Sequence, residues 1–169
     1  MSKAKKASNK PAAKKKVAPV PSGYHDVTPY IVCRGASDAI AFYKKAFGAK
    51  EKYRMAGPDG RVMHAEILIG RSTIMLGDEM PEMGATSPQT INGTASGLFL
   101  YLPNVDKAFA KAVAAGARAE QPPTDMFWGD RYAKLADPFG HKWSMATHIE
   151  DLTPKEMARR SDEAMKAMK

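Results

Sequence analysis

The first ordered pattern along the chain is an extended stretch followed by a helical one. Residues 26–33 are rich in β-branched and aromatic side chains, which favours a strand. After them, apolar residues recur at intervals of three or four up to Phe47, the spacing of an amphipathic helix. Ser37 is the expected N-cap of this helix, and Gly48 is expected to end it.

Three more strands are predicted before the middle of the chain. Residues 50–56 and 61–69 flank Gly57-Pro58-Asp59-Gly60, which combines the fixed φ of proline with permissive glycine and predicts a hairpin turn. Residues 72–77 form one more short apolar run after a glycine-containing turn. The first half therefore has the order β-α-β-β-β.

The second half repeats this order. Residues 97–102 predict a strand and the alanine-rich residues 105–115 a helix. Two further strands, residues 131–136 and 141–148, flank the turn Asp137-Pro138-Phe139-Gly140. The pattern indicates a second copy of the same supersecondary unit.

The residues that follow the two predicted helices also match in type, which supports the repeat. Asp38 is followed ten residues later by Gly48-Ala49-Lys50, and Asp106 is followed ten residues later by Gly116-Ala117-Arg118, an offset of 68. This period is too long for a solenoid and fits duplication of one module. One module alone could not cover both faces and the edges of its own sheet, so two are expected to pair.

The predicted fold class is α+β. Two tandem βαβββ modules, residues 24–79 and 95–148, form a curved, cup-like mixed sheet with the helices outside. A polar, proline-containing linker over 80–94 joins them, and together they make a single domain over residues 22–149.

A C-terminal helix is predicted within residues 150–169. Thr153-Pro154-Lys155-Glu156 is a capping box with proline at the first helical position. The helix carries one stripe of small and thioether side chains, which would dock either on its own domain or on a second copy. We expect a homodimer on this basis. The stripe consists of Met157, Ser161, Ala164, Met165 and Met168.

Charge is concentrated at the N-terminus. The chain has 26 Lys and Arg against 18 Asp and Glu, a net charge of +8, and seven of the lysines lie in residues 1–21, which leaves +1 for the rest. This segment has no acidic or aromatic residue, so we expect a disordered basic arm. It either only solubilises the protein or makes weak, non-specific contacts with nucleic-acid phosphates, as in an adaptor.

Several classes of protein are excluded by what the sequence lacks. No apolar run approaches the roughly 20 residues of a membrane span, and no apolar region of a secretory signal follows the lysines, so no membrane association and a cytoplasmic location are expected. Cys33 is the only cysteine, so no intrachain disulfide can form, and on a buried strand it is a poor nucleophile. Motifs of phosphate-binding loops, serine hydrolases and HExxH metalloproteases do not occur.

The tandem modules resemble the vicinal oxygen chelate superfamily of glyoxalases, bleomycin-resistance proteins and extradiol dioxygenases. The resemblance covers residues 24–148 and includes the segment AIAFYKKAFG over residues 39–48 and the turn Asp137-Pro138-Phe139-Gly140. Four further segments look like the PhnB-like branch. They are Thr28-Pro29-Tyr30, Met63-His64-Ala65-Glu66, Phe127 to Tyr132 and Trp143 to His148.

The resemblance also implies where a metal would bind. Metal-using members place a His or similar ligand on the first strand of each module and a Glu on the last. These positions fall here on Thr28, on Gly97 or Ser96, on Ser144, and on Ile74 or Leu76. None is a histidine or a carboxylate. We therefore expect no cofactor and a metal-independent protein that binds a small organic molecule, as the resistance-type members do.

His64 and Glu66 are the main candidates for chemistry. They lie two residues apart on a predicted strand and so share a face. A neutral histidine beside a carboxylate can act as a general acid or base, or supply half of a divalent metal site in a lyase or dioxygenase-like enzyme. The alternative is a buried, hydrogen-bonded pair that has a structural role or orients a substrate. Whether the protein is an enzyme stays open at this point.

The expected ligand pocket is rich in aromatic residues. Trp128 and Arg131 lie in or beside a loop, a combination that holds anionic or aromatic ligands, although an Asp130–Arg131 ion pair could simply fix this loop. Trp143 is expected to fill the core, His141 to be exposed or bonded within its turn, and His148 to have no functional role. The candidate pocket comprises Thr28, Tyr30, His64, Glu66, Phe99, Tyr101, Trp128, Arg131 and Ser144.

Overall fold

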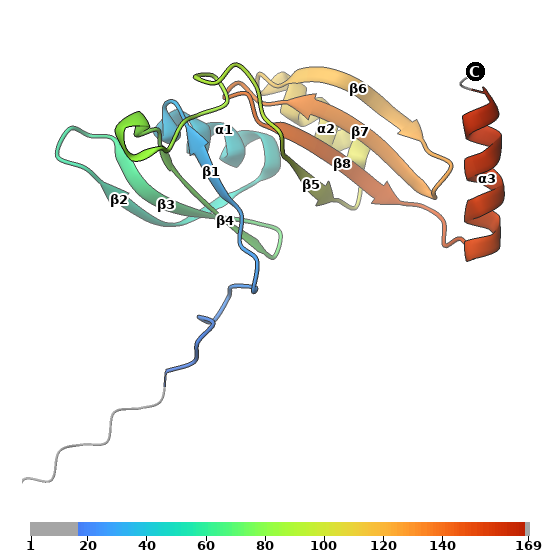
Figure 1. The fold of residues 1–169 in the computed structure, drawn as a ribbon, viewed down its shortest axis with the longest axis horizontal. Helices are drawn as coiled ribbons and strands as arrows, with labels where there is room; N and C mark the ends of the chain where they lie inside the picture. Colours follow the sequence, from blue (N-terminus) through green and yellow to red (C-terminus); the bar gives the residue numbers. More distant parts are fainter. Residues whose placement is uncertain (1–16, 168–169) are drawn as a thin grey trace, which may run out of the picture.

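The computed structural model describes residues 17–167 and confirms the α+β class, with eight strands in two mixed four-stranded sheets. Most of the lysine-rich segment, residues 1–16, lies outside the described residues. In Figure 1 the two sheets stand side by side, with the helices of the two modules behind them.

The first sheet is built by the first module. Its strand order is β1-β4-β3-β2, with β1 parallel to β4 and the other pairs antiparallel. The elements are β1 (Tyr30–Cys33), α1 (Ala36–Phe47), β2 (Lys50–Ala56), β3 (Val62–Ile69) and β4 (Ser72–Asp78). A short 3-10 turn, η1 (Pro81–Met83), opens the linker.

The second module repeats this topology, with strand order β5-β8-β7-β6. Its elements are β5 (Gly97–Tyr101), α2 (Val105–Ala114), β6 (Arg118–Asp125), β7 (Asp130–Ala136) and β8 (Lys142–His148). The hydrophobic pattern did not predict β6, because its sequence RAEQPPTD is polar and contains two prolines. As an edge strand it tolerates prolines, and its register with β7 shifts between Gln121 and Thr124.

The start of α1 differs from the prediction. Ser37 is not its N-cap, because the cap position is Gly35 in a left-handed conformation with φ of 86° and no side-chain cap bond. The backbone N–H groups of Gly35 and Ala36 instead donate to Oδ1 of Asp78, at 2.9 and 2.7 Å. A carboxylate from the end of β4 thus satisfies the free donors of the helix terminus. Gly48 ends the helix as predicted, with φ of 69°.

The core is sandwiched between the sheets and the helices and is continuous between the two modules. Trp143 and Tyr43 are fully buried, and their ring centroids lie 5.5 Å apart. Both donate to Oδ2 of Asp137, Tyr43 through its hydroxyl at 2.7 Å and Trp143 through Nε1 at 2.9 Å. The expectation that Trp143 fills the core is confirmed, and its indole nitrogen has the partner that a buried donor requires.

The C-terminal helix α3 (Pro154–Ala167) begins where the capping box predicts, with Thr153 accepting from the N–H of Glu156 at 3.2 Å. It stands at the edge of the second module in Figure 1. None of its described residues is buried, and Met165 is 61% exposed. Arg160 pairs with Glu150 at 2.8 Å and holds the helix to the preceding segment. The described part of the methionine stripe is therefore not buried on its own domain, while Met168 lies outside the described residues.

No helix within residues 17–167 is long and apolar enough to cross a membrane.

Candidate functional site

Each sheet turns one face to its helix and leaves the other face open. Along β3, Ala65 and Ile67 are fully buried toward the helix, while His64 and Glu66 alternate onto the open face. Tyr30 of β1 joins them there, and its ring stacks on that of His64 with centroids 5.9 Å apart. The predicted shared face of His64 and Glu66 is therefore present.

Three side chains surround the Glu66 carboxylate. The Tyr24 hydroxyl donates to Oε2, the ammonium of Lys52 lies 3.5 Å from the same oxygen, and Nε2 of His64 lies 3.5 Å from Oε1. The hydrogen bond from Tyr24 is the main cause that lowers the pKa of Glu66. Burial acts in the opposite direction, and His64 and Lys52 add smaller lowering effects. A carboxylate held ionised in this way is poorly suited to donating a proton and well suited to orienting His64.

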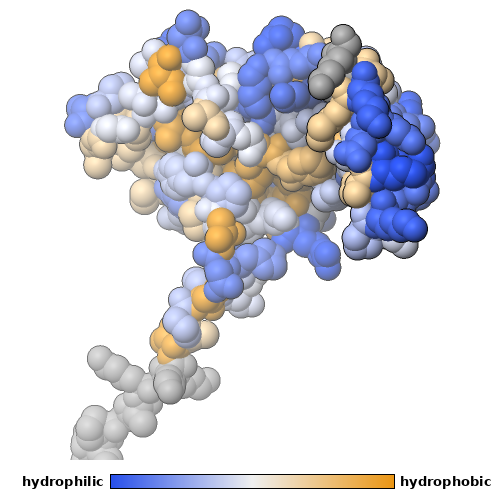
Figure 2. Space-filling view, turned by 45° about the vertical axis from the view of Figure 1, so that its right-hand side comes forward, coloured by the Kyte–Doolittle hydropathy of each residue, from blue (hydrophilic) through white to orange (hydrophobic). Residues whose placement is uncertain are grey.

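The open face of the second sheet carries a chain of aromatic rings. Phe99 lies 4.9 Å from Tyr101 and 6.0 Å from Tyr132 between ring centroids, and Tyr132 lies 5.8 Å from Trp128. The hydroxyls of Tyr132 and Ser144 are hydrogen-bonded at 2.7 Å. Phe99 and Tyr101 are 49% and 65% exposed, an unusual position for two large rings. Figure 2 shows hydrophobic residues gathered near the middle of the view, with hydrophilic residues around them.

Asp130 lies beneath the end of this aromatic chain and is only 3% exposed. It accepts hydrogen bonds from the Tyr101 hydroxyl and Trp128 Nε1, both at 3.1 Å, and pairs with Nδ1 of His148 at 2.8 Å. No functional role was predicted for His148 from the sequence, and this group of hydrogen-bonded side chains was not predicted. The alternation of β8 could have placed His148 on the face of Ser144, but its pairing with Asp130 depends on the register between β7 and β8.

Arg131 is not on the aromatic face. Its guanidinium pairs with Asp106 at the start of α2 and with Asp125 at the end of β6, at 2.7 and 2.8 Å. Both partners raise the pKa of Arg131, with the hydrogen bond to Asp106 as the larger cause. The considered Asp130–Arg131 ion pair is not formed, because adjacent residues of β7 point to opposite faces. Arg131 instead links α2 to the edge of the sheet.

The strand register corrects one of the positions inferred for a family metal site. Tyr30 pairs with Met75 in the first module, as Phe99 pairs with Ser144 in the second. The counterpart of Ser144 is therefore Met75, and not Ile74 or Leu76, which are buried on the helix side.

The residues at these positions do not fit the metal that the family implies. Thr28 donates its hydroxyl to the carbonyl of His25 at 3.3 Å, and the hydroxyl of Ser144 is bonded to Tyr132. Gly97 has no side chain, and Met75 offers only a soft thioether. Within residues 17–167, no three His, Cys, Asp or Glu side chains gather closely enough to hold an ion.

A cavity of about 340 Å³ lies at the seam between the two modules. It brings together Thr28 from the segment before β1 and Phe99 from β5, two of the predicted pocket residues. Its remaining lining is mostly apolar, with hydroxyls from Ser72 and Thr73. The further lining residues are His25, Val27, Pro29, Ile74, Gly97, Leu98, Leu100 and Trp143.

The predicted pocket is thus divided among three places. Thr28 and Phe99 line the seam cavity. The other predicted residues apart from Arg131 lie on the open faces, with Tyr30, His64 and Glu66 on the first sheet, and Tyr101, Trp128 and Ser144 on the second.

His141 also lies at the seam. As expected it is bonded within its turn, because its backbone N–H donates to Oδ1 of Asp137 at 2.9 Å, but its side chain is not exposed. It is 8% exposed, with Nε2 at 3.1 Å from the Val32 carbonyl and 3.6 Å from Sγ of Cys33. Burial raises the pKa of the Cys33 thiol to about 12, so it is not a nucleophile near neutral pH. Both residues join the modules.

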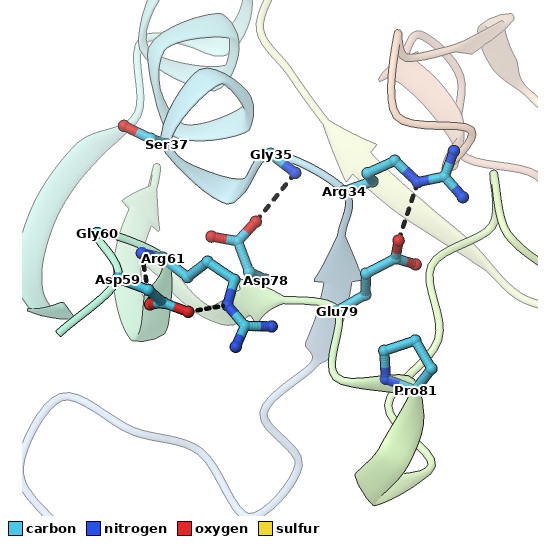
Figure 3. Close-up of a pocket in the computed structure, with 9 residues that line it drawn as sticks. All are labelled: Arg34, Gly35, Ser37, Asp59, Gly60, Arg61, Asp78, Glu79 and Pro81. Carbon is cyan, nitrogen blue, oxygen red and sulfur yellow. Dashed lines mark hydrogen bonds and ion pairs between the residues drawn. The ribbon is translucent and has the colours of Figure 1, made fainter. Parts of the chain in front are cut away.

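A wider and more open hollow of about 570 Å³ lies at the N-terminus of α1 and is shown in Figure 3. Its charged groups are already paired: Arg34 with Glu79 at 2.9 Å, and Arg61 with Asp59 at 2.6 Å. Asp78 accepts from the helix terminus. None of the predicted site residues lines this hollow.

Comparison with known proteins identifies the family. The sequence model of the Glyoxalase/Bleomycin resistance protein/Dioxygenase superfamily matches residues 25–145. The chain belongs to this superfamily. This confirms the resemblance that the motifs indicated.

Alignments with individual relatives cover most of the chain of this superfamily member. This chain is 39% identical to the uncharacterized protein Mb0911c of Mycobacterium bovis over 134 residues. The alignment covers 78% of this chain and 88% of that protein. Among solved structures, an Arabidopsis thaliana gene product is 27% identical with a TM-score of 0.59, covering 73% of this chain and 98% of that one. A PhnB protein from Bacillus cereus is 18% identical with a TM-score of 0.57, covering 73% of this chain and 99% of that one. This similarity is one of fold.

Proposed function

We propose that this superfamily member binds a small, largely apolar organic molecule in the seam cavity without the metal of the family's enzymes. The observation that carries the proposal is the cavity of about 340 Å³, whose size suits a small ligand and whose walls combine apolar side chains with a few polar groups. The unsuitable donors at the family's metal positions support the second half of the proposal.

The walls of the cavity indicate an uncharged aromatic or aliphatic ligand. Phe99 supplies a half-exposed ring, and Trp143 closes the cavity from the core side. The hydroxyls of Thr28 and Thr73 already donate to carbonyls of His25 and Gly23, at 3.3 and 3.2 Å. The segment before β1 therefore forms part of the wall, and the free polar groups left for a ligand are few.

The test uses indole as probe and thermal unfolding as readout. A ligand that binds only the folded state raises the melting temperature with concentration. We expect indole to stabilise the wild type but not Thr28→Phe, which fills the cavity. Val20→Phe is the matched control, since Val20 belongs to the same segment but does not line the cavity. Equal stabilisation of Thr28→Phe and the wild type would refute binding at the seam.

The rival is a metal-dependent lyase or dioxygenase-like enzyme that uses His64 and Glu66. The observation in its favour is the 3.5 Å approach of the two side chains on an open face. Metal analysis of the purified protein, with melting temperatures in zinc, manganese, nickel and iron, separates the two functions. A stoichiometric metal that is lost in His64→Ala would overturn the metal-independent proposal.

We also propose that the protein forms a homodimer through α3, because the described apolar residues of this helix are not buried by their own domain. Deletion of residues 152–169 is expected to convert the dimer to a monomer in light scattering. A truncated protein that stays dimeric contradicts the role of α3.

The basic arm is proposed to make at most weak, salt-sensitive contacts with nucleic acid through its seven lysines. Comparing the full chain with one lacking residues 1–21 in a DNA-binding titration tests this. Equal affinities would exclude the arm as the contact.

A further inference from the structure

A hydrogen-bonded chain leads from the interior to the surface at the end of the second sheet. Asp130 is nearly inaccessible and anchors Nδ1 of His148 at 2.8 Å. Tyr101 and Trp128 occupy the other carboxylate oxygen. Because Nδ1 of His148 is hydrogen-bonded to the Asp130 carboxylate, the imidazole is held in one orientation, with Nε2 directed outward.

Nε2 of His148 already meets a carboxylate. Oδ1 of Asp151 lies 3.0 Å away, and the Asp151 side chain is fully exposed. Asp151 belongs to the segment between β8 and α3, and among the described residues this is its one side-chain hydrogen bond. An exposed pair of this kind contributes little stability, so another carboxylate can replace it at small cost.

The neighbouring surface offers aromatic contact. Trp128 and Tyr101 are fixed by their hydrogen bonds to Asp130 and are therefore held close to His148. The rings of Phe99 and Tyr132 continue from them across the sheet. Such rigid rings can stack on a planar ligand without a large loss of side-chain freedom.

We propose that His148, Tyr101 and Trp128 form a binding site for aromatic carboxylates, and that Asp151 occupies the place of the ligand's carboxylate when the site is free. The ligand ring lies on the aromatic side chains, and its carboxylate accepts the hydrogen bond from Nε2 of His148 in place of Asp151.

The charges around the site select the ligand class. The titratable groups that face His148 are Asp130 on β7 and Asp151 in the following segment, with Tyr101 of β5 bonded to the same Asp130. The hydrogen bond to Asp130 and then that to Asp151 raise the pKa of His148, so the imidazolium persists to higher pH. A protonated imidazole repels ammonium groups. The carboxylates of Asp130 and Asp151 disfavour a dianionic ligand such as a phosphate monoester. The ligand class that remains is a monoanionic carboxylate.

This site is separate from the proposed seam cavity. The cavity lies at the Gly97 end of β5, whereas Tyr101 and His148 are at the far ends of β5 and β8. Phe99 is the one residue shared by the seam cavity and the chain of aromatic rings, so the variants used in the test leave it unchanged.

Calorimetric titration of the full chain with 2-naphthoate tests the proposal, with 2-naphthylmethylammonium as the probe of opposite charge. We expect wild type to bind naphthoate in preference to the ammonium. His148→Gln should weaken naphthoate binding about tenfold or more, because it removes the cationic donor. Asp151→Asn should strengthen it about threefold or more, because it removes the competing carboxylate.

Asp162→Asn is the matched control, an exposed carboxylate on α3 that gives the same change of net charge. It should leave naphthoate affinity unchanged. Naphthoate affinity of the wild type should also fall as pH rises above 6.5 through the raised pKa of His148, because the neutral imidazole presents a lone pair at Nε2.

A gain of affinity in Asp151→Asn distinguishes a ligand site from a merely structural contact, which would lose stability and gain no binding. The variant changes an exposed side chain, so it tests the site even where His148→Gln perturbs folding. The proposal is overturned if Asp151→Asn binds naphthoate no better than Asp162→Asn, or if the ammonium probe binds more tightly.

Discussion

Gly129 lies where the turn before β7 meets the segment that leads to α3. Its carbonyl accepts from the N–H groups of Ile149 and Glu150, at 2.9 and 3.0 Å, and its φ is +91°. A Cβ at this position would lie 2.3 Å from the carbonyl oxygen of Glu150, a backbone atom that cannot rotate away. Glycine is therefore required both by conformation and by close approach.

We expect Gly129→Ala to lower the free energy of unfolding by about 3 kcal/mol, as the sum of a left-handed backbone penalty and a displaced segment. Gly60→Ala is the control, because Gly60 has φ of +81° but no atom within 4 Å of the added Cβ, and it should cost about 1 kcal/mol. Urea denaturation measures both. Equal losses would show that the contact with Glu150 is unimportant.

Residue identity predicted part of the candidate site. Alternation along a strand was enough to place His64 and Glu66 on one face. It could not reveal that Tyr24, 42 positions from Glu66, donates to that carboxylate. Nor could it join Asp130 to His148, since these residues meet only through the register of β7 and β8.

At the scale of elements, the two long helices of the modules are capped in different ways. Asn104 caps α2 directly, accepting from the N–H of Lys107 at 2.8 Å. The N-terminus of α1 is capped by Asp78 and not by Ser37, the residue predicted from the sequence. The physical reason is that Gly35, in its left-handed conformation, is an N-cap two residues before Ser37, which places the N–H groups of Gly35 and Ala36 within reach of Asp78 at the end of β4.

We expect Asn104→Ala to lower the free energy of unfolding by about 1 kcal/mol, the usual cost of losing an N-cap. Ser37→Ala should change it by less than about 0.5 kcal/mol, because the Ser37 hydroxyl only accepts an exposed hydrogen bond from Arg54. Chemical denaturation of the two variants side by side is the measurement. A larger loss in Ser37→Ala would contradict the capping arrangement.

At the scale of the whole molecule, the two modules are joined through a buried polar group. Asp137 accepts from the hydroxyl of Tyr43 in α1 and from Nε1 of Trp143 in β8, and also from the N–H groups of Phe139 and His141. A buried carboxylate is stable only with such partners. The network therefore makes the fold of one module depend on the other.

We expect Tyr43→Phe to lower the free energy of unfolding by about 2 kcal/mol, because a hydrogen bond to a buried charge is lost while the ring remains. Unfolding should stay a single transition followed identically by fluorescence and circular dichroism. Tyr53→Phe, at a half-exposed tyrosine on the open face, is the control and should be close to neutral. Equal effects of the two variants would argue against the joining role of Asp137.

The sequence by itself determined the duplicated module apart from strand β6, the superfamily, the C-terminal helix and the face shared by His64 and Glu66. These features depend on local periodicity, turn-forming residues and motif spacing, all of which are properties of the sequence itself. Tertiary structure alone decided that Met75 is the counterpart of Ser144, that Arg131 faces α2, and that Asp130 holds His148. The reason is that strand register and the packing of the two modules bring together residues far apart in sequence, and no local pattern specifies those distances.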